Sequence, residues 1–303
     1  MHVDWHGVMP ALLTQMKEDG ALDLDGTAAH VRCCLEAGID GLVMLGTLGE
    51  NTSLSSQEKI EVLRCAIDAA GSRVPILAGV AEYTTRQAIE FASRAERTGA
   101  SGLMVLPCMV YEQDQREAIA HFQAVARSTQ LPVMIYNNPV SYRTDLTPDS
   151  FARLVECENI LAVKESSHDS RRITEMINRL EYRFLLFCGV DDLALENLLC
   201  GAAGWVSGLA NAFPDEAVEL YRLARAGQLA PALELYRWFM PMLRLDTHSK
   251  LVQNIKLANH VVGQGSEWVR APRLTLEGEE RARVEAIVRR AIHTRPARAG
   301  LAA

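Results

Sequence analysis

No two cysteines in this 303-residue chain have the spacing of a redox or metal-binding pair. The seven cysteines form no C-x-x-C motif, and the eight histidines form no H-E-x-x-H or comparable ligand pair. We therefore predict no metal site and no thiol–disulfide redox motif. Because the odd number of cysteines is scattered through apolar segments, we expect reduced, buried thiols and a cytoplasmic protein.

The chain also lacks an excess of positive charge and a membrane-spanning segment. Its 31 Lys and Arg residues against 38 Asp and Glu residues give a formal net charge of −7, which argues against a nucleic-acid or anionic-membrane partner. The longest uncharged run, 197–214, contains three glycines and several polar residues, so we predict a buried segment there and no membrane span. Residues 1–5 do not begin a basic and then apolar leader, so we expect no targeting signal.

Short apolar runs alternate along the chain with longer segments that have helical spacing. The runs lie at residues 8–13, 41–45, 75–78, 102–106, 132–136, 160–164, 184–188 and 204–207. Apolar strands separated by amphipathic helices are typical of a parallel sheet buried on both faces. Eight units of roughly 25–30 residues predict an α/β fold of the (β/α)8 TIM-barrel type. A doubly wound sheet is the alternative, but no G-x-G-x-x-G follows the first strand.

A C-terminal helical extension is predicted after the eighth strand. An apolar stripe between Leu229 and Leu243 indicates one helix, and two more are expected at about 249–262 and 277–292. We therefore divide the chain into three parts, namely a catalytic barrel at 1–225, a helical segment at 226–294 and a tail at 295–303 that we expect to be disordered.

Three of the predicted strand ends carry residues suited to catalysis. The second strand runs into G-T-L-G-E-N at 46–51, the fifth ends in Y-N-N-P at 136–139, and the sixth ends in V-K-E-S-S at 163–167. Taken singly, Lys164 would be a solvated charge, Tyr136 a packing residue and the glycines a turn. Active sites of TIM barrels lie at the carboxyl ends of the strands, so the three segments together favour a catalytic interpretation.

These segments resemble those of the dihydrodipicolinate synthase/N-acetylneuraminate lyase family, which carries a G-T-T-G-E loop, a Y-N-x-P segment and an I-K-E/D strand end. The order and approximate spacing match over about residues 5–220. The resemblance implies a class I aldolase-like enzyme in which Lys164 forms a Schiff base with a small 2-oxo or cyclic imino acid. It also implies that Tyr136 shuttles protons, that no cofactor is needed, and that the enzyme is a homotetramer.

The resemblance further assigns substrate-binding residues around the lysine. The loop after the second strand would hold the substrate carboxylate through backbone N–H groups and a threonine hydroxyl, as an anion nest does. Residues just past the fifth strand would contact a substrate hydroxyl, and residues at the end of the eighth strand would line the wall beside the lysine. The set comprises Thr47, Leu48, Gly49, Asn138, Ser141, Tyr142, Val206 and Ser207.

Three departures from the family's synthases narrow the expected substrate. Leu48 stands where the synthases carry a second threonine, and Cys108 and Met109 stand where they carry paired tyrosines. Ser141 occupies the position of an arginine that binds a second carboxylate. Arg143 would replace that arginine only with a shifted register. Lysine biosynthesis is therefore not expected.

The variant motifs, together with F-C-G-V-D-D at 187–192, are similar to those of the Δ1-pyrroline-4-hydroxy-2-carboxylate deaminases of hydroxyproline degradation. This narrower resemblance implies a lyase or hydrolase-type deaminase that releases ammonia and 2,5-dioxopentanoate. Two alternatives remain. One is another enzyme of this scaffold, either a 2-keto-3-deoxy sugar acid dehydratase or a pyruvate-dependent aldolase. The other is a non-catalytic 2-oxo-acid sensor, against which the intact Lys164 and Tyr136 argue.

Overall fold

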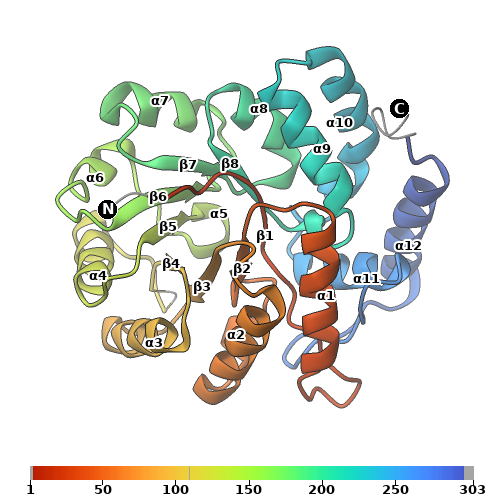
Figure 1. Cartoon of the computed structure of the whole chain (residues 1–303), viewed down its shortest axis with the longest axis horizontal. Coiled ribbons are helices and arrows are strands. Elements are labelled where there is room, and N and C mark those ends of the chain that lie inside the picture. Colours follow the sequence, from red (N-terminus) through yellow and green to blue (C-terminus); the bar gives the residue numbers. More distant parts are fainter. Residues whose placement is uncertain (1–2, 109, 297–303) are drawn as a thin grey trace.

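The centre of the computed structural model, which describes residues 3–108 and 110–296, is a parallel eight-stranded sheet. The strands follow the order β1-β8-β7-β6-β5-β4-β3-β2, and a bridge between Ala11 and Val43 joins the first and second strands. The sheet therefore forms a (β/α)8 TIM barrel, which confirms the predicted fold (Figure 1). The strands are β1 (Gly7–Pro10), β2 (Leu42–Met44), β3 (Ile76–Val80), β4 (Gly102–Val105), β5 (Val133–Asn137), β6 (Ile160–Glu165), β7 (Leu185–Cys188) and β8 (Gly204–Ser207).

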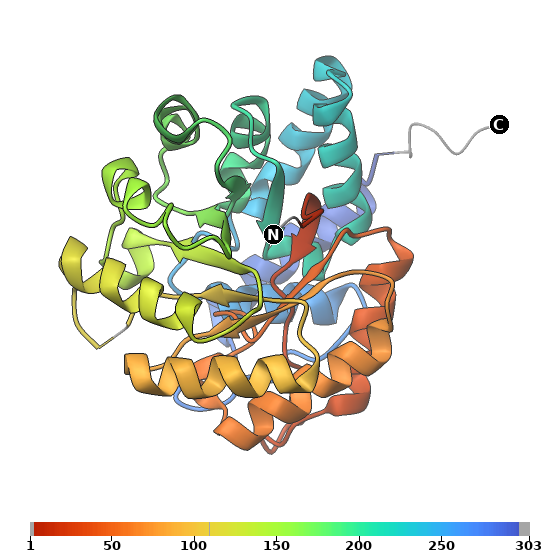
Figure 2. The same ribbon diagram turned by 60° about the vertical axis from the view of Figure 1, so that its left-hand side comes forward.

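Helices connect the strands on the outside of the barrel, and Figure 2 shows two of them, α2 and α3, side by side against the strands. The second helix begins with a capping box, because the Ser55 hydroxyl accepts a hydrogen bond from the Glu58 N–H while the Glu58 carboxylate accepts one from the Ser55 N–H. The helices are α1 (Leu24–Glu36), α2 (Ser56–Ala70), α3 (Thr85–Thr98), α4 (Gln115–Arg127), α5 (Pro139–Tyr142), α6 (Pro148–Ala152), α7 (Arg171–Leu180), α8 (Ala194–Leu199) and α9 (Pro214–Arg225).

Alternate apolar residues of β2 to β6 belong to two separate apolar clusters. In β5, Met134 and Tyr136 belong to one buried cluster, whereas Val133 and Ile135 belong to another. The first cluster includes the barrel interior, where Tyr136 lines a cavity, and extends to the C-terminal helices, whereas the second packs beneath the helices that surround the barrel. Burial on both faces explains why the strands appear in the sequence as uninterrupted apolar runs.

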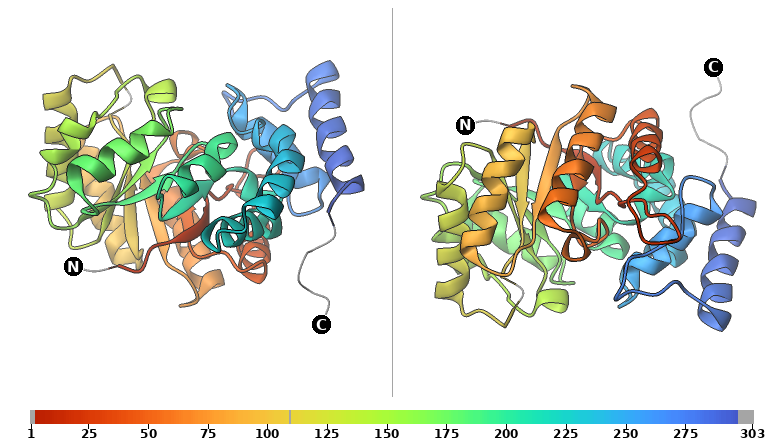
Figure 3. Two further views of the ribbon diagram at one scale, coloured as in Figure 1. Left: turned by 90° about the horizontal axis from the view of Figure 1, so that it is seen from above. Right: turned by 90° about the horizontal axis from the view of Figure 1, so that it is seen from below.

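Three helices follow the barrel and gather beside one flank of it (Figure 3). They are α10 (Leu229–Leu243), α11 (Leu251–Val261) and α12 (Gly278–His293), close to the predicted positions. At the start of the tail that we expected to be disordered, Arg295 pairs with Glu216 at 2.9 Å, and residues 297–303 lie outside the described residues. None of the helices in the described part of the chain combines the length and apolar character that crossing a membrane requires.

Buried polar contacts fix α11 against the barrel. The Lys256 ammonium lies 2.5 Å from the Glu50 carboxylate, and both side chains are fully buried. The second oxygen of Glu50 accepts a hydrogen bond from the Arg270 backbone N–H at 3.0 Å. One turn further along α11, Asn259 donates to the backbone oxygen of Asn211 at 2.8 Å. The C-terminal segment is thus attached to the loop that follows β2.

The expectation of buried thiols was wrong for three of the seven cysteines. Cys33 and Cys65 are half-buried on α1 and α2, and Cys200 is exposed directly after α8. The other four are buried, and all seven are free thiols.

We expect the Lys256–Glu50 pair to be a major contributor to stability. Lys256→Met should lower the free energy of unfolding by about 3–5 kcal/mol, because it leaves a buried carboxylate without its closest cation. Lys250 pairs with Glu280 where both side chains are partly exposed, so the control Lys250→Met should cost less than about 1 kcal/mol. Chemical denaturation of both variants measures the difference, and equal losses would contradict the assignment.

Candidate active site

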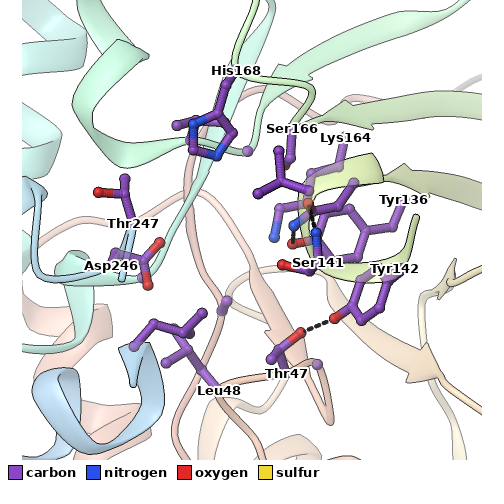
Figure 4. A pocket seen from close by; sticks show the side chains of 18 of the residues that line it. Thr47, Leu48, Tyr136, Ser141, Tyr142, Lys164, Ser166, His168, Asp246 and Thr247 are labelled. Atoms are coloured by element: carbon purple, nitrogen blue, oxygen red, sulfur yellow. Dashed lines mark hydrogen bonds between the residues drawn. The ribbon is translucent and has the colours of Figure 1, made fainter. Parts of the chain in front are cut away.

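A cavity of about 510 Å³ lies at the carboxyl ends of the barrel strands. Its lining comes from β4, β5 and β6, from the segments that follow β1, β2, β5, β6, β7 and β8, and from the start of α11 with the segment that precedes it. Seven of the sequence-predicted residues line it, namely Thr47, Leu48, Tyr136, Asn138, Ser141, Tyr142 and Lys164. The barrel therefore brings most of the predicted site together (Figure 4).

The register of two neighbouring strands places Lys164 beside Tyr136. These residues are directly paired between β5 and β6, so their side chains leave the sheet on the same face. The Lys164 Nζ atom lies 3.9 Å from the centre of the Tyr136 ring, and only 6% of Lys164 is exposed. One position further along the strands, Asn137 donates to the Glu165 carboxylate at 3.0 Å and so joins the two strand ends.

Gly189, directly after β7, makes room for the lysine. A Cβ atom at Gly189 would lie 2.8 Å from Lys164 Cε and 2.0 Å from the Ser166 hydroxyl oxygen. Such distances are too short for any side chain, so this glycine is required by close approach. The aliphatic part of the Lys164 side chain therefore packs directly against the backbone at Gly189.

Burial lowers the pKa of Lys164, because desolvation disfavours the ammonium form, whereas the nearby Asp246, Tyr142 and Asp191 act in the opposite direction. Only a neutral amine can attack a carbonyl or imine carbon. Desolvation therefore brings the nucleophilic form of Lys164 closer to neutral pH.

Tyr136 is buried, and its hydroxyl accepts a hydrogen bond from a residue directly after its own strand. Asn138 Nδ2 donates to the Tyr136 hydroxyl at 2.9 Å, while Asn138 Oδ1 accepts from the Ser141 N–H at 3.0 Å. Burial raises the pKa of Tyr136 to about 12, so the phenol keeps its proton at neutral pH and can deliver it. Asn138 also lines the cavity, and its amide keeps a second N–H, so its contact with substrate stays a prediction.

Tyr142 and Thr47 form a second hydroxyl pair across the cavity floor. The Tyr142 hydroxyl and the Thr47 hydroxyl are hydrogen-bonded, as Figure 4 shows. The ring of Tyr142 packs edge-on against that of Tyr136, with centroids 5.7 Å apart and an interplanar angle of 82°. Burial raises the pKa of Tyr142. Both tyrosines therefore remain protonated next to the lysine.

The loop after β2 is held in an unusual backbone conformation. Leu45 has a φ of 60°, in the left-handed region that side chains rarely adopt. Asn51 compensates by donating to the backbone oxygens of Leu45 at 2.9 Å and Gly79 at 3.0 Å. This turn carries Thr47 and Leu48 to the cavity wall.

Three predicted residues are not among those that line the cavity, and their contact with substrate stays a prediction. Gly49 packs on backbone, where a Cβ atom would lie 2.9 Å from the Leu45 nitrogen. Val206 is part of the apolar core. The Ser207 hydroxyl faces the buried Asp191 carboxylate at 3.4 Å, and the cavity wall at this strand end is formed by Gly208 instead.

Two charged residues near these loops lie away from the cavity. Glu50, in the same loop as Thr47, points away from the cavity toward Lys256. Arg143 is exposed at the end of α5 and is not among the lining residues, so it does not replace the arginine of the synthases. Met109 lies outside the described residues, whereas Cys108 is buried and donates its thiol hydrogen to the Tyr83 backbone oxygen.

One wall of the cavity was not predicted from the sequence. The segment between α10 and α11 contributes Asp246, Thr247, His248 and Ser249, and α11 contributes its first residue, Leu251. A polar run between two amphipathic helices was the available signal, but nothing in strand periodicity points to it. Figure 4 shows Asp246 and Thr247 across the cavity from Tyr136 and Ser141.

A buried aspartate lies beneath this wall. Asp191 accepts hydrogen bonds from the Trp205 indole at 2.9 Å and from the backbone N–H groups of Gly208 at 3.1 Å and Leu209 at 2.7 Å. Burial raises the pKa of Asp191 to about 6. Within residues 3–108 and 110–296, no group of three or more metal-ligating side chains comes together.

A TIM barrel with a buried lysine beside a tyrosine hydroxyl at its carboxyl end has the arrangement of a lysine-dependent lyase. The chain belongs to the dihydrodipicolinate synthetase family, whose sequence profile matches residues 4–291.

Similar proteins of known name cover nearly the whole chain. The 4-hydroxy-tetrahydrodipicolinate synthase of Methanothrix thermoacetophila is 32% identical over 285 residues, which are 94% of this chain and 96% of that protein. The synthase of the same name from Acidothermus cellulolyticus is 34% identical over 277 residues, 91% of this chain and 89% of that protein.

Solved structures agree with this family assignment. The dihydrodipicolinate synthase of Acinetobacter baumannii, in complex with pyruvate, superposes with a TM-score of 0.91 at 29% identity, covering 94% of this chain and 98% of that chain. YagE from E. coli K12, a prophage protein of the dihydrodipicolinic acid synthase family, also in complex with pyruvate, gives 0.90 at 29% identity, with 96% and 99% covered.

Lys164 is expected to be the residue that bonds covalently to a 2-oxo acid. Borohydride reduction in the presence of pyruvate should add a stable mass to the peptide that contains Lys164, and trapping should become faster as the pH rises through the lowered pKa of this lysine. Lys164→Arg should trap nothing, because a guanidinium stays protonated. Lys17→Arg, at an exposed site, is the matched control, and trapping by Lys164→Arg would refute the assignment.

Tyr136 is expected to act through its hydroxyl and not through its ring. Tyr136→Phe keeps the packing, so the midpoint of unfolding should change little, while turnover should fall by about 100- to 10,000-fold if the hydroxyl transfers protons. Tyr182→Phe, at an 80% exposed ring, should turn over normally. An unchanged kcat for Tyr136→Phe would leave the residue a purely structural role.

Proposed function

We propose that this protein is a Schiff-base-dependent deaminase that converts Δ1-pyrroline-4-hydroxy-2-carboxylate to 2,5-dioxopentanoate and ammonia. The proposal goes beyond the family assignment, because it names a substrate for the lysine at the end of β6. Lys164 and Tyr136 are the proposed catalytic residues, and the substrate is a small cyclic imino acid.

The composition of the cavity wall carries this proposal. Among its described lining residues there is one lysine and no arginine, so a second substrate carboxylate has no guanidinium to bind it. The cavity instead carries hydroxyl groups from Thr47, Ser141 and Tyr142, and a carboxyl group from Asp246 on the wall across from Tyr136. A compact substrate with one carboxylate and one hydroxyl matches this wall better than a dicarboxylate does.

The turn after β2 is the proposed site of the single carboxylate. It presents the Thr47 hydroxyl and the backbone of Thr47 and Leu48 to the cavity, and Asn51 holds its strained conformation. A nest of backbone N–H groups binds an anion without a charged side chain. This placement puts the substrate carbon next to the carboxylate within reach of Lys164.

Lysine addition then opens the ring. Neutral Lys164 attacks the C2 carbon of the cyclic imine, and the ring nitrogen leaves C2 as the amine of C5 after taking up a proton. The result is a protonated imine between Lys164 and C2. Tyr136, which retains its proton at neutral pH and lies against the lysine, is placed to deliver and recover protons in these exchanges.

Elimination and hydrolysis complete the reaction. The positive imine nitrogen makes a C3 proton acidic, and its removal gives an enamine. The enamine electrons then form the C3–C4 double bond as the C4–O bond breaks and the hydroxyl leaves as water. Proton shifts move the unsaturation to C5, and hydrolysis at C5 and at C2 consumes two waters, releasing ammonia, 2,5-dioxopentanoate and free Lys164. The net reaction consumes one water.

Two related reactions use the same first step. The similar proteins named above are 4-hydroxy-tetrahydrodipicolinate synthases, which makes pyruvate condensation the first competitor, but Leu48 and Ser141 replace the threonine and arginine that resemblance assigns to the synthases. Dehydration of a 2-keto-3-deoxy sugar acid is the second competitor. It is favoured by the same hydroxyl-rich wall, because it eliminates water in the same way.

The proposed reaction predicts rapid release of ammonia from Δ1-pyrroline-4-hydroxy-2-carboxylate. Ammonia is measured directly, and the second product is measured with a dehydrogenase that oxidises 2,5-dioxopentanoate. The 4-deoxy analogue, Δ1-pyrroline-2-carboxylate, should form the lysine imine but release no ammonia, because it has no leaving hydroxyl.

Comparison of kcat/KM across substrates separates the competitors. Efficient condensation of pyruvate with aspartate semialdehyde, with no ammonia from the pyrroline, would overturn the proposal in favour of a synthase. A higher kcat/KM for a 2-keto-3-deoxy pentonate would overturn it in favour of a dehydratase.

A further inference from the structure

We propose that Asp246 is the acid that protonates the departing hydroxyl group of the substrate, an inference that rests on the elimination proposed above. The family motifs at the strand ends do not include this residue. It is delivered to the cavity from outside the barrel, by the segment that joins α10 to α11.

The position of Asp246 suits a group that acts on the far end of the substrate. Lys164 and Tyr136 occupy one wall of the cavity, and Figure 4 shows the Asp246 carboxyl group on the opposite wall. A substrate attached to Lys164 through C2 extends C3 and C4 away from the lysine. The leaving hydroxyl on C4 therefore lies toward the wall that carries Asp246.

The barrel has a space shaped for this carboxyl group. A Cβ atom at Gly208 would lie 2.0 Å from Asp246 Oδ1, so no other residue at position 208 leaves the carboxyl group where it is. The backbone of Gly208 has φ −80° and ψ −47°, which any residue adopts without strain. The close approach of Asp246 is therefore the reason for a glycine here.

The carboxyl group is packed in place, but its buried oxygen makes no hydrogen bond to the part of the protein that the structure describes. Asp246 Oδ1 is buried and has no hydrogen-bond partner among the described residues. Buried polar atoms in folded proteins are nearly always hydrogen-bonded, and an exception calls for a functional explanation. Because Oδ1 lies against Gly208, the substrate hydroxyl that the proposed reaction supplies would meet the other carboxyl oxygen, Oδ2.

The surroundings keep this carboxyl group protonated to a higher pH than usual. Burial raises the pKa of Asp246 well above its ordinary value, the carboxylates of Asp191 and Asp192 raise it further, and Lys164 acts in the opposite direction. His248 of the same segment and His168 after β6 also line the cavity. A carboxyl group that is still protonated near neutral pH can serve as a general acid.

The proton transfer completes the elimination step. As the C4–O bond breaks, its electron pair leaves with the oxygen, which takes the proton of Asp246 and departs as water. Asp246 becomes a carboxylate, next to the protonated imine that has re-formed at C2. A later proton, such as the one released in the shift toward C5, restores the acid.

Asp246→Asn tests this role because it keeps the shape of the side chain and removes the acidic proton. Three rates are compared with wild type: borohydride trapping of pyruvate on Lys164, exchange of the pyruvate methyl protons in D2O, and ammonia release from Δ1-pyrroline-4-hydroxy-2-carboxylate. Trapping and exchange need no leaving hydroxyl and should stay within about threefold, whereas ammonia release should fall by about 100- to 10,000-fold.

Two further variants and a pH profile make the test specific. Gly208→Ala should displace the carboxyl group and reduce ammonia release in the same selective way, while Asp149→Asn, at an exposed ion pair with Arg179, should behave as wild type. Ammonia release by wild type should decline at alkaline pH as Asp246 loses its proton, and Asp246→Asn should lack this decline.

The outcomes separate the role of Asp246 from the identity of the substrate. Normal ammonia release by Asp246→Asn would overturn the acid role. Loss of both pyruvate trapping and ammonia release in this variant would also overturn it. If wild type releases no ammonia but dehydrates a 2-keto-3-deoxy pentonate, and Asp246→Asn loses that dehydration selectively, the proposed substrate is wrong and the acid role is supported. If wild type eliminates water from neither compound, both proposals are overturned.

Discussion

The buried ion pair between Glu50 and Lys256 is the constraint on which the cavity depends. Two full charges with no solvent exposure are stable only when they face each other, so the loop after β2 and helix α11 have one permitted arrangement. That arrangement determines both sides of the cavity, because the loop carries Thr47 and the segment before α11 carries Asp246. A helical extension outside the barrel thereby becomes part of the site.

Two glycines, which have no side chains, shape the cavity as much as its larger residues do. Gly189 and Gly208 follow neighbouring strands, β7 and β8, and each leaves space that another residue's functional group occupies, Lys164 in one case and Asp246 in the other. The interior of the barrel is otherwise packed with large side chains, so these two gaps decide where the amine and the carboxyl group lie. They leave room for the two groups on opposite walls of the cavity.

Strand periodicity predicted all eight strands, and the strand-end rule placed Lys164 and Tyr136 together, because parallel register is a local property of neighbouring strands. Other parts of the site depend on information that periodicity lacks. Ser207 and Gly208 are adjacent in sequence, yet only the structure shows that Ser207 turns to Asp191 and Gly208 to the cavity. Asp246 was missed because tertiary packing of two helices, and not any strand, brings it to the barrel mouth.

Helix α5 has only four residues, yet two parts of the site depend on it. Its cap, Asn138, orients the Tyr136 hydroxyl, and its last residue, Tyr142, reaches Thr47. So short a helix has no stability of its own, so it forms and opens as one cooperative unit with those contacts. Amide hydrogen exchange at Tyr142, whose N–H bonds to the Asn138 carbonyl, therefore reports how often the tyrosines lose their alignment. A ligand that fills the cavity and holds Thr47 and Tyr142 together would slow that exchange without any change in the mean structure.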